Sequence, residues 1–281
     1  MLHWFSDPLT YDFMRYALAM GLWVGILCPV VGSYLVVQRM TFLANVMSHA
    51  VLPGLAIASA LGLNILLGAV VAGLLSAALI SWIQSQSFLK VDAVMSATLA
   101  SFFALGILLI TVLKVKLDLE SFLFGDILSV TQGDVTRTGV ITIVLLILVV
   151  LSYRSLLFFT FDPIGAQVQG LPVPLMNWAL TLAISLTVVA GMQAVGVVLI
   201  IAMMVCPALA AYLWVKELHW MMILGAILGM VCSVVGLYTS YYLDLPSGAA
   251  IALAAFGSFL LALCFSPRHG ILASFFTRSL P

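Results

Sequence analysis

The chain has 281 residues, of which 64% are hydrophobic and only 7% are charged, so it cannot cover the surface of an ordinary soluble protein. Its formal net charge is zero, which provides no basic field for nucleic acid. Because the apolar residues run along the whole length, and each membrane-spanning helix needs about 20 of them, we expect about eight to ten spans.

Charged residues divide the chain into apolar stretches, and each stretch must be helical to satisfy its backbone polar groups in lipid. The expected fold class is therefore all-α, a polytopic membrane protein formed by residues 1–281 as a single transmembrane domain. The short links at 61–65 and 192–195 leave eight spans as the alternative to nine. The nine expected spans are 16–38, 42–61, 65–84, 93–113, 138–153, 175–192, 195–215, 220–242 and 247–265.

Lysine and arginine are distributed unevenly between the two sides of the membrane. Basic residues favour cytoplasmic connections, so the richer side is expected to be cytoplasmic. This places the N-terminus outside and the C-terminus in the cytoplasm of a protein of the cell membrane. The richer side carries Arg39, Lys90, Arg154, Lys216, Arg268 and Arg278, and the other side carries Arg15, Lys114, Lys116 and Arg137.

Two connections are long enough to contain structure of their own. In the outer one, 118–134, apolar residues recur at partial helical spacing, which favours a short surface-lying or re-entrant helix. In the inner one, 155–174, Asp162 can act as an N-cap, Pro163 as the first helical residue and Gly170 as the stop. The inner pattern predicts a short cytoplasmic helix, with an ordinary loop as the alternative.

Polar residues that could act on a substrate are concentrated in the second span. Asn45 and His49 are four residues apart and share one helix face. Polar side chains at membrane depth usually face a bundle interior or a watery path. An imidazole nitrogen and an amide oxygen could hold a divalent cation loosely, with water or other ligands completing the shell. Alternatively, His49 hydrogen-bonds a neighbouring helix, while Pro53 kinks the span.

Other motifs limit the range of functions. The sequence has no G-x-x-x-x-G-K-[ST], so it does not bind ATP through a P-loop, and it has no common hydrolytic signature. The four cysteines are scattered singly and are best explained as packing residues. Pro207 interrupts another span, and such prolines line cavities in transporters but also occur in ordinary packing.

Six blocks carry a resemblance to a known family, namely 32–54, 122–130, 161–173, 193–214, 241–251 and 265–270. With these blocks the chain resembles the membrane permease subunit of bacterial ATP-binding-cassette (ABC) importers for manganese, zinc or iron. The resemblance covers essentially the whole chain. The segments SHAVLPG and SFFALGI resemble the manganese-type members more than the zinc-type members.

The resemblance implies an importer-type ABC permease that is a transport component and not an enzyme, with no cofactor of its own. It implies a pore made of two permease copies, an ATPase dimer at the cytoplasmic face, and an extracellular or periplasmic metal-binding protein that delivers the ion. It also assigns the inner helix, with Asp162, Pro163, Ala166 and Gly170, to contact with the ATPase. The segment around Phe122 to Leu128, within the outer helix expected at 118–134, is expected near the docking surface of the binding protein.

One position departs from the family. Its metal-contacting pair is usually an aspartate and a histidine four residues apart; His49 matches, but the aspartate position is Asn45. Three explanations of Asn45 are open. The amide oxygen is sufficient for a site that the ion only passes through, another acidic residue supplies the charge, or the pore is a heterodimer with a different permease that keeps the aspartate. Manganese is the expected substrate, with zinc or iron as alternatives. An ion-gradient-driven secondary transporter is the second functional class, although no acid lies at the centre of any span.

Overall fold

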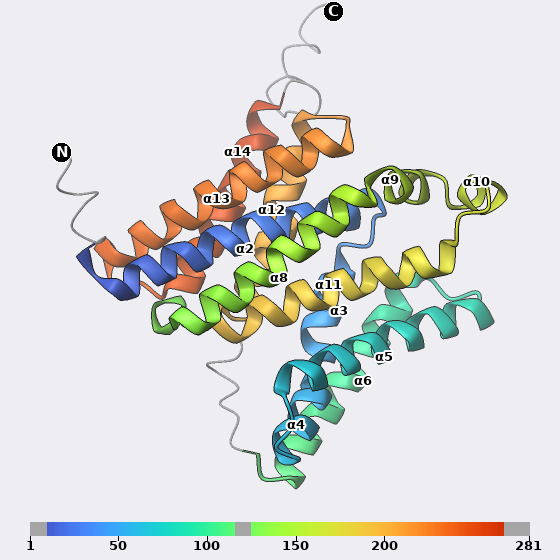
Figure 1. Cartoon of the computed structure of the whole chain (residues 1–281), viewed down its shortest axis with the longest axis horizontal. Coiled ribbons are helices and arrows are strands. Elements are labelled where there is room, and N and C mark those ends of the chain that lie inside the picture. Colours follow the sequence, from blue (N-terminus) through green and yellow to red (C-terminus); the bar gives the residue numbers. More distant parts are fainter. Residues whose placement is uncertain (1–9, 116–124, 267–281) are drawn as a thin grey trace, which may run out of the picture.

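The computed structural model describes residues 10–115 and 125–266, and helices dominate it (Figure 1). Within those ranges, nine helical segments are long and apolar enough to cross a membrane, which confirms the nine expected spans. The segments are α2 (Asp12–Val37), α3 with α4 (Phe42–Ala50 and Leu52–Ala60), α5 (Ile65–Gln86), α6 (Val91–Val112), α8 (Gln132–Leu151), α11 (Val173–Val195), α12 (Val197–Trp214), α13 (Leu218–Leu243) and α14 (Ser247–Phe265).

Both short links are true helix boundaries, which excludes the count of eight. The side chain of Asn64 accepts a hydrogen bond of 3.0 Å from the N–H of Leu66 and so caps the start of α5. Gly196 alone separates α11 from α12, with φ 86° and ψ 157°. That combination of angles is essentially restricted to glycine, so this one residue allows the chain to leave one helix and enter the next.

Two short helices connect α8 to α11. They are α9 (Tyr153–Phe161) and α10 (Pro163–Val168), and Figure 1 shows them at one end of the molecule, far from the N-terminal end of α2. We call this end of the bundle the α10 end. Gln38, Gln84 and Asn177 line one pocket, so the last turns of α2 and α5 and the first turn of α11 also meet there.

Glycines allow several helices to approach one another closely. A Cβ added to Gly25 of α2 would lie 2.9 Å from the backbone carbonyl of Gly229 in α13. In the same way Gly54 of α4 lies against the backbone of Gly68 in α5. Without a strong hydrophobic force between helices in lipid, such small-residue contacts supply the packing. Figure 1 shows α11 between the group around α2 and the group of α3 to α6, and α11 contacts both α12 and α5.

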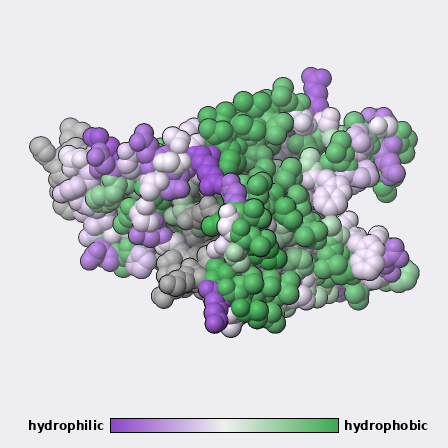
Figure 2. Space-filling view, turned by 60° about the horizontal axis from the view of Figure 1, so that its bottom comes forward, coloured by the Kyte–Doolittle hydropathy of each residue, from purple (hydrophilic) through white to green (hydrophobic). Residues whose placement is uncertain are grey.

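The outer surface of the bundle is strongly apolar. Figure 2 shows a broad band of hydrophobic side chains on one face, with hydrophilic residues gathered toward the ends. Exposed leucines, isoleucines and valines cover α5, α6 and α8. A soluble protein rarely exposes a continuous apolar patch of this kind, so the band is a lipid-facing surface.

The outer connection agrees only in part with the expected helix at 118–134, because residues 116–124 lie outside the described ranges. In the described part, η2 (Ile127–Ser129) is a short 3-10 helix whose Ile127 is buried. The next span then begins at Gln132 and not at 138, because Thr131 and Asp134 form a capping box. Polar caps therefore lengthen α8 beyond the apolar run from which its start was predicted.

Candidate functional site

The second span is a broken helix, and the break lies at Val51, two residues after His49. Its first half, α3, ends at Ala50, and the second half, α4, begins at Leu52. Pro53 has no N–H to donate to the carbonyl of His49, its normal helical acceptor, so the regular hydrogen-bond ladder cannot continue. The expected kink is therefore present, and it places His49 in the last turn of α3.

One face of α3 is accessible, and it carries the two candidate ligands. Six of the nine residues of α3 are buried, whereas Phe42 is exposed and Asn45 and His49 are partly exposed. Ser48, on a different face, is buried and donates a hydrogen bond of 2.9 Å to the carbonyl of Ala44. The prediction that Asn45 and His49 share a face is confirmed, and they form the only accessible polar stripe on this enclosed helix.

The His49 ring is held by an aromatic contact. It stands edge-on to Phe103 of α6, with 5.4 Å between ring centroids and 85° between ring planes. Its Nδ1 is buried and has no hydrogen-bond partner among the described residues. The alternative reading, a hydrogen bond to a neighbouring helix, is therefore not seen for this nitrogen. Leaving such a group unpaired costs about 1–3 kcal/mol, which favours a role for the imidazole beyond packing.

Two contacts fix how α3 and α4 lie along α6. His49 meets Phe103, and a Cβ added to Gly106 would lie 2.6 Å from the Cβ of Leu52. Both pairs are 54 residues apart, so the helices run in parallel with a constant register over this length. We call the accessible boundary between them the α3–α6 seam.

The seam continues toward the α10 end through polar residues of α6. Ser96 and Asp92 precede Phe103 by seven and eleven residues, a spacing that places all three on nearly the same helix face. Both Ser96 and Asp92 are exposed. Asp92 lies in the first turn of α6, whose N-terminus lies at the α10 end. The seam therefore carries one acid between His49 and that end.

One copy of the chain offers too few ligands to hold a metal ion tightly. The described ranges contain no group of three or more His, Cys, Asp or Glu that could hold one. The seam supplies one imidazole and one carboxamide, which suit a passing dication whose shell is completed by water or by groups of another subunit. The geometry thus fits a transit site.

The inner connection folds as its caps predict. The carboxylate of Asp162 accepts a 2.8 Å hydrogen bond from the N–H of Gly165, and Pro163 occupies the first turn of α10. Gly170 ends the turn with φ 80°, and Ala166 is fully buried. The ordinary-loop alternative is therefore wrong, and Asp162, Pro163, Ala166 and Gly170 are brought together in one compact element.

Sequence reasoning missed the outward face of α10. Ile164 and Val168 are four residues apart and are 77% and 83% exposed, respectively. They lie on the side of α10 that faces away from buried Ala166. An apolar pair at this spacing was visible in the sequence, but only the structure shows that the pair lies outside the lipid-facing band. An exposed apolar pair on a short helix is suited to docking against another protein.

Pro207 lies in a different setting from Pro53. It is buried inside α12, which continues without interruption from Val197 to Trp214. A Cβ added to Gly225 of α13 would lie 3.7 Å from the carbonyl oxygen of Pro207. The structure thus places Pro207 at a packing contact between α12 and α13, inside a helix that continues on both sides of it.

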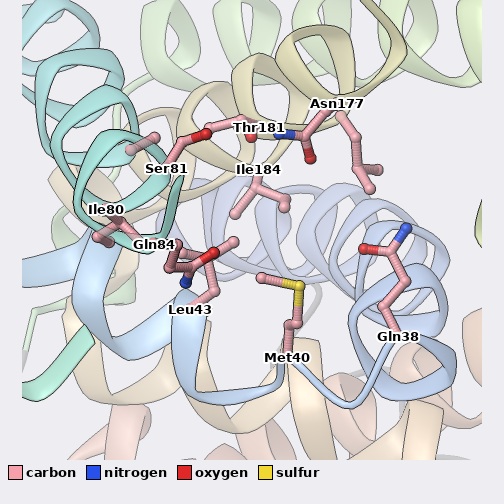
Figure 3. A pocket seen from close by; sticks show the side chains of 11 residues that line it. Gln38, Met40, Leu43, Ile80, Ser81, Gln84, Asn177, Thr181 and Ile184 are labelled. Carbon is pink, nitrogen blue, oxygen red and sulfur yellow. The ribbon is translucent and has the colours of Figure 1, made fainter. Parts of the chain in front are cut away.

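A polar pocket behind α3 was also missed. It has a volume of about 220 Å³, and Figure 3 shows the carboxamides of Gln38, Gln84 and Asn177 around it. The Nε2 of Gln84 is buried without a hydrogen-bond partner among the described residues. Leu43 lines this pocket from the face of α3 opposite Asn45. The three carboxamides come from three different helices, so no local motif could reveal the pocket. Its size and polarity suit a small cluster of water molecules.

The arrangement in the described ranges, nine apolar helices with an accessible polar seam and a capped surface helix, is that of a polytopic membrane protein. The family model described as the ABC 3 transport family matches residues 10–266. The manganese transport system membrane protein MntC of Halalkalibacterium halodurans is 38% identical over 96% of this chain and 93% of its own length. A probable iron transport system membrane protein of Haemophilus influenzae is 38% identical over 97% of this chain and 96% of its own length.

A solved structure shows the same fold. PsaBC from Streptococcus pneumoniae, in complex with Fab, aligns with a TM-score of 0.88 and 36% identity over 98% of this chain and 100% of that chain. The chain belongs to the ABC 3 transport family, and it is the multi-pass permease component of an ABC importer. The alternative of an ion-gradient-driven secondary transporter is therefore set aside, because ABC permeases work with an ATPase.

Proposed function

We propose that this permease moves a divalent transition-metal ion into the cell, with manganese as the first choice. The observation that carries the proposal is the Asn45–His49 stripe, the accessible polar face of a helix that is otherwise enclosed. The name of the relative from H. halodurans supports manganese, whereas that of the H. influenzae relative supports iron. Nitrogen and oxygen ligands without thiolate suit Mn²⁺ and Fe²⁺, and zinc remains the third choice.

A second copy of the chain completes the transit site in this proposal. A two-fold axis beside the α3–α6 seam would bring two His49 and two Asn45 side chains to one ion, giving four protein ligands. A homodimer is the first form to test, and a heterodimer with a partner that keeps an aspartate is the alternative raised by Asn45. Asp92 is the acid on the seam that supplies negative charge on the way out.

The proposed orientation puts the α10 end in the cytoplasm. Among the described basic residues, Arg39 follows α2, Lys90 precedes α6, Arg154 lies in the first turn of α9 and Lys216 precedes α13, all helix ends at the α10 end; Arg15, Lys114 and Arg137 belong to the opposite helix ends. The N-terminus is then outside, and an extracellular or periplasmic metal-binding protein docks at the outer end. At the inner end α10 fits into a groove of the ATPase, which performs the hydrolysis, so this chain has no catalytic role. The whole chain serves as one permease domain.

Metal-resolved uptake into proteoliposomes tests the proposal. The permease is reconstituted with its ATPase and binding protein, and uptake is measured for manganese, iron and zinc. His49→Ala should abolish uptake, while size-exclusion chromatography shows that the complex still assembles. Ser48→Ala, on the neighbouring but buried face of α3, is the matched control and should transport normally. Wild-type uptake by the His49→Ala complex would exclude the proposed site.

A further inference from the structure

A second feature lies on the lipid-facing surface, apart from the metal path. An apolar groove of about 530 Å³ runs between α2, α8 and α13. Its walls are aliphatic and methionine side chains, and the two polar residues that line it are Tyr153 and His219. Their rings meet edge-on, with centroids 6.5 Å apart. The groove is therefore apolar along its length and polar at one end only.

The length of the groove matches one leaflet of a bilayer. It follows α13 from His219 to Met230, and eleven residues of helix span roughly 16 Å. The hydrocarbon core of a bilayer is about 30 Å thick, so one leaflet contributes about 15 Å. His219 lies in the first turn of α13, which starts at the α10 end. The groove thus extends from the polar surface at that end to about the bilayer midplane.

Two cations lie close in sequence to the residues at the polar end of the groove. Arg154 follows Tyr153, and Lys216 precedes His219 by three residues; both cations are exposed. Neither forms an ion pair with an acid in the described ranges. The nearby acid, Glu217, is already engaged, with 3.2 Å between its carboxylate and the Nε2 of His219. Basic residues beside a groove between membrane helices attract anionic headgroups.

We propose that the groove binds one phospholipid with an anionic headgroup from the leaflet at the α10 end. One acyl chain fills the apolar groove, and the headgroup phosphate lies between Arg154 and Lys216. The chain would touch α8 and α13 at once, and α8 continues through α9 into α10. A bound lipid would therefore stabilise the position of α8, and of α9 and α10 that follow it, relative to α13.

Thermal unfolding of the purified importer complex in detergent tests this site without any measurement of transport. Phosphatidylglycerol and phosphatidylcholine with identical long acyl chains are added in turn. Phosphatidylglycerol should raise the unfolding midpoint by roughly 2–4 °C more than phosphatidylcholine. The double variant Arg154→Gln, Lys216→Gln should remove this difference. Arg137→Gln, which removes a cation at the opposite end, is the matched control and should retain it.

A short-chain phosphatidylglycerol separates the groove from simple charge attraction. It carries the same headgroup but cannot fill the groove, so it should give no more than a small fraction of the shift. The proposal is overturned if both long-chain lipids stabilise equally, if the double variant keeps the preference, or if the short-chain lipid is as effective as the long. Since metal is absent from these measurements, failure of the lipid site and failure of the metal proposal are distinguishable.

Discussion

His49 of α3 stands edge-on to Phe103 of α6, with ring centroids 5.4 Å apart. An aromatic contact of this geometry contributes about 0.5–1.5 kcal/mol beyond its buried area and restricts the orientation of the imidazole. The orientation of the ring is thus set by a contact within the protein, with Asn45 one turn away on the same face. Ligands fixed in advance by neighbouring side chains lose less freedom on binding.

Restoring the missing charge should tighten the transit site. In the Asn45→Asp variant a carboxylate replaces a neutral amide beside the ion, and charge counts strongly in a site of low dielectric. We expect the dissociation constant of the purified complex for Mn²⁺ to fall by about tenfold or more. Isothermal titration calorimetry measures it, with Asn45→Ala as the weakened counterpart. Equal affinity of the wild-type and Asp proteins would show that position 45 does not face the ion.

Asp92 should matter for release along the α3–α6 seam. The Asp92→Asn variant removes a negative charge from the seam, so the maximal uptake rate should fall several-fold. Because His49 is unchanged, the affinity for Mn²⁺ at the proposed transit site should stay constant. Asp244→Asn at the opposite end is the control; Asp244 has a left-handed backbone with φ 51°, which asparagine tolerates. An unchanged maximal rate in Asp92→Asn would remove this acid from the path.

Substitution of Gly196 should destabilise the protein. An alanine at φ 86° and ψ 157° is strained by about 1–3 kcal/mol, because a Cβ clashes with its own backbone there. The thermal unfolding midpoint in detergent should therefore drop. Gly257 of α14 has nothing within 4 Å of an added Cβ, so Gly257→Ala should be neutral or slightly stabilising. If Gly196→Ala unfolds at the wild-type temperature, the one-residue joint between α11 and α12 is described incorrectly.

The outward face of α10 should control association with the ATPase. Ile164→Ser and Val168→Ser each remove an exposed apolar side chain whose burial contributes about 1.5–3 kcal/mol, so the ATPase should co-purify poorly with either variant. Gln167→Ala, an exposed polar position on the same helix, should leave the complex intact. Normal recovery of the ATPase with both serine variants would mean that another surface makes the contact.

The spans and the capped helix were predictable because their causes are local. An apolar run in lipid has to be helical, and Asp162 with Pro163 starts α10 through bonds to residues no more than a few positions away. Spacing alone also placed Asn45 and His49 on one face. The boundary error at α8 arose because its first turn is polar and is held by the Thr131 capping box.

The rest of the site depends on contacts between distant segments. Phe103 follows His49 by 54 residues, and no pattern in either helix indicates that the two rings meet. The enclosure of α3, which makes one polar stripe stand out, is likewise produced by α5, α6 and α11 together. The pocket lined by Gln38, Gln84 and Asn177 gathers residues from three spans, each of which looks unremarkable alone.

The N–H of Gly165 donates a hydrogen bond to the carboxylate of Asp162, so the first turn of α10 is held in its helical form by the chain itself. Docking then needs no disorder-to-order transition, so little entropy is lost at each encounter. A preformed helix can transmit a displacement in either direction, whereas a flexible loop would change its own conformation instead. The cap at Asp162 thus keeps the first turn of α10 formed independently of any partner.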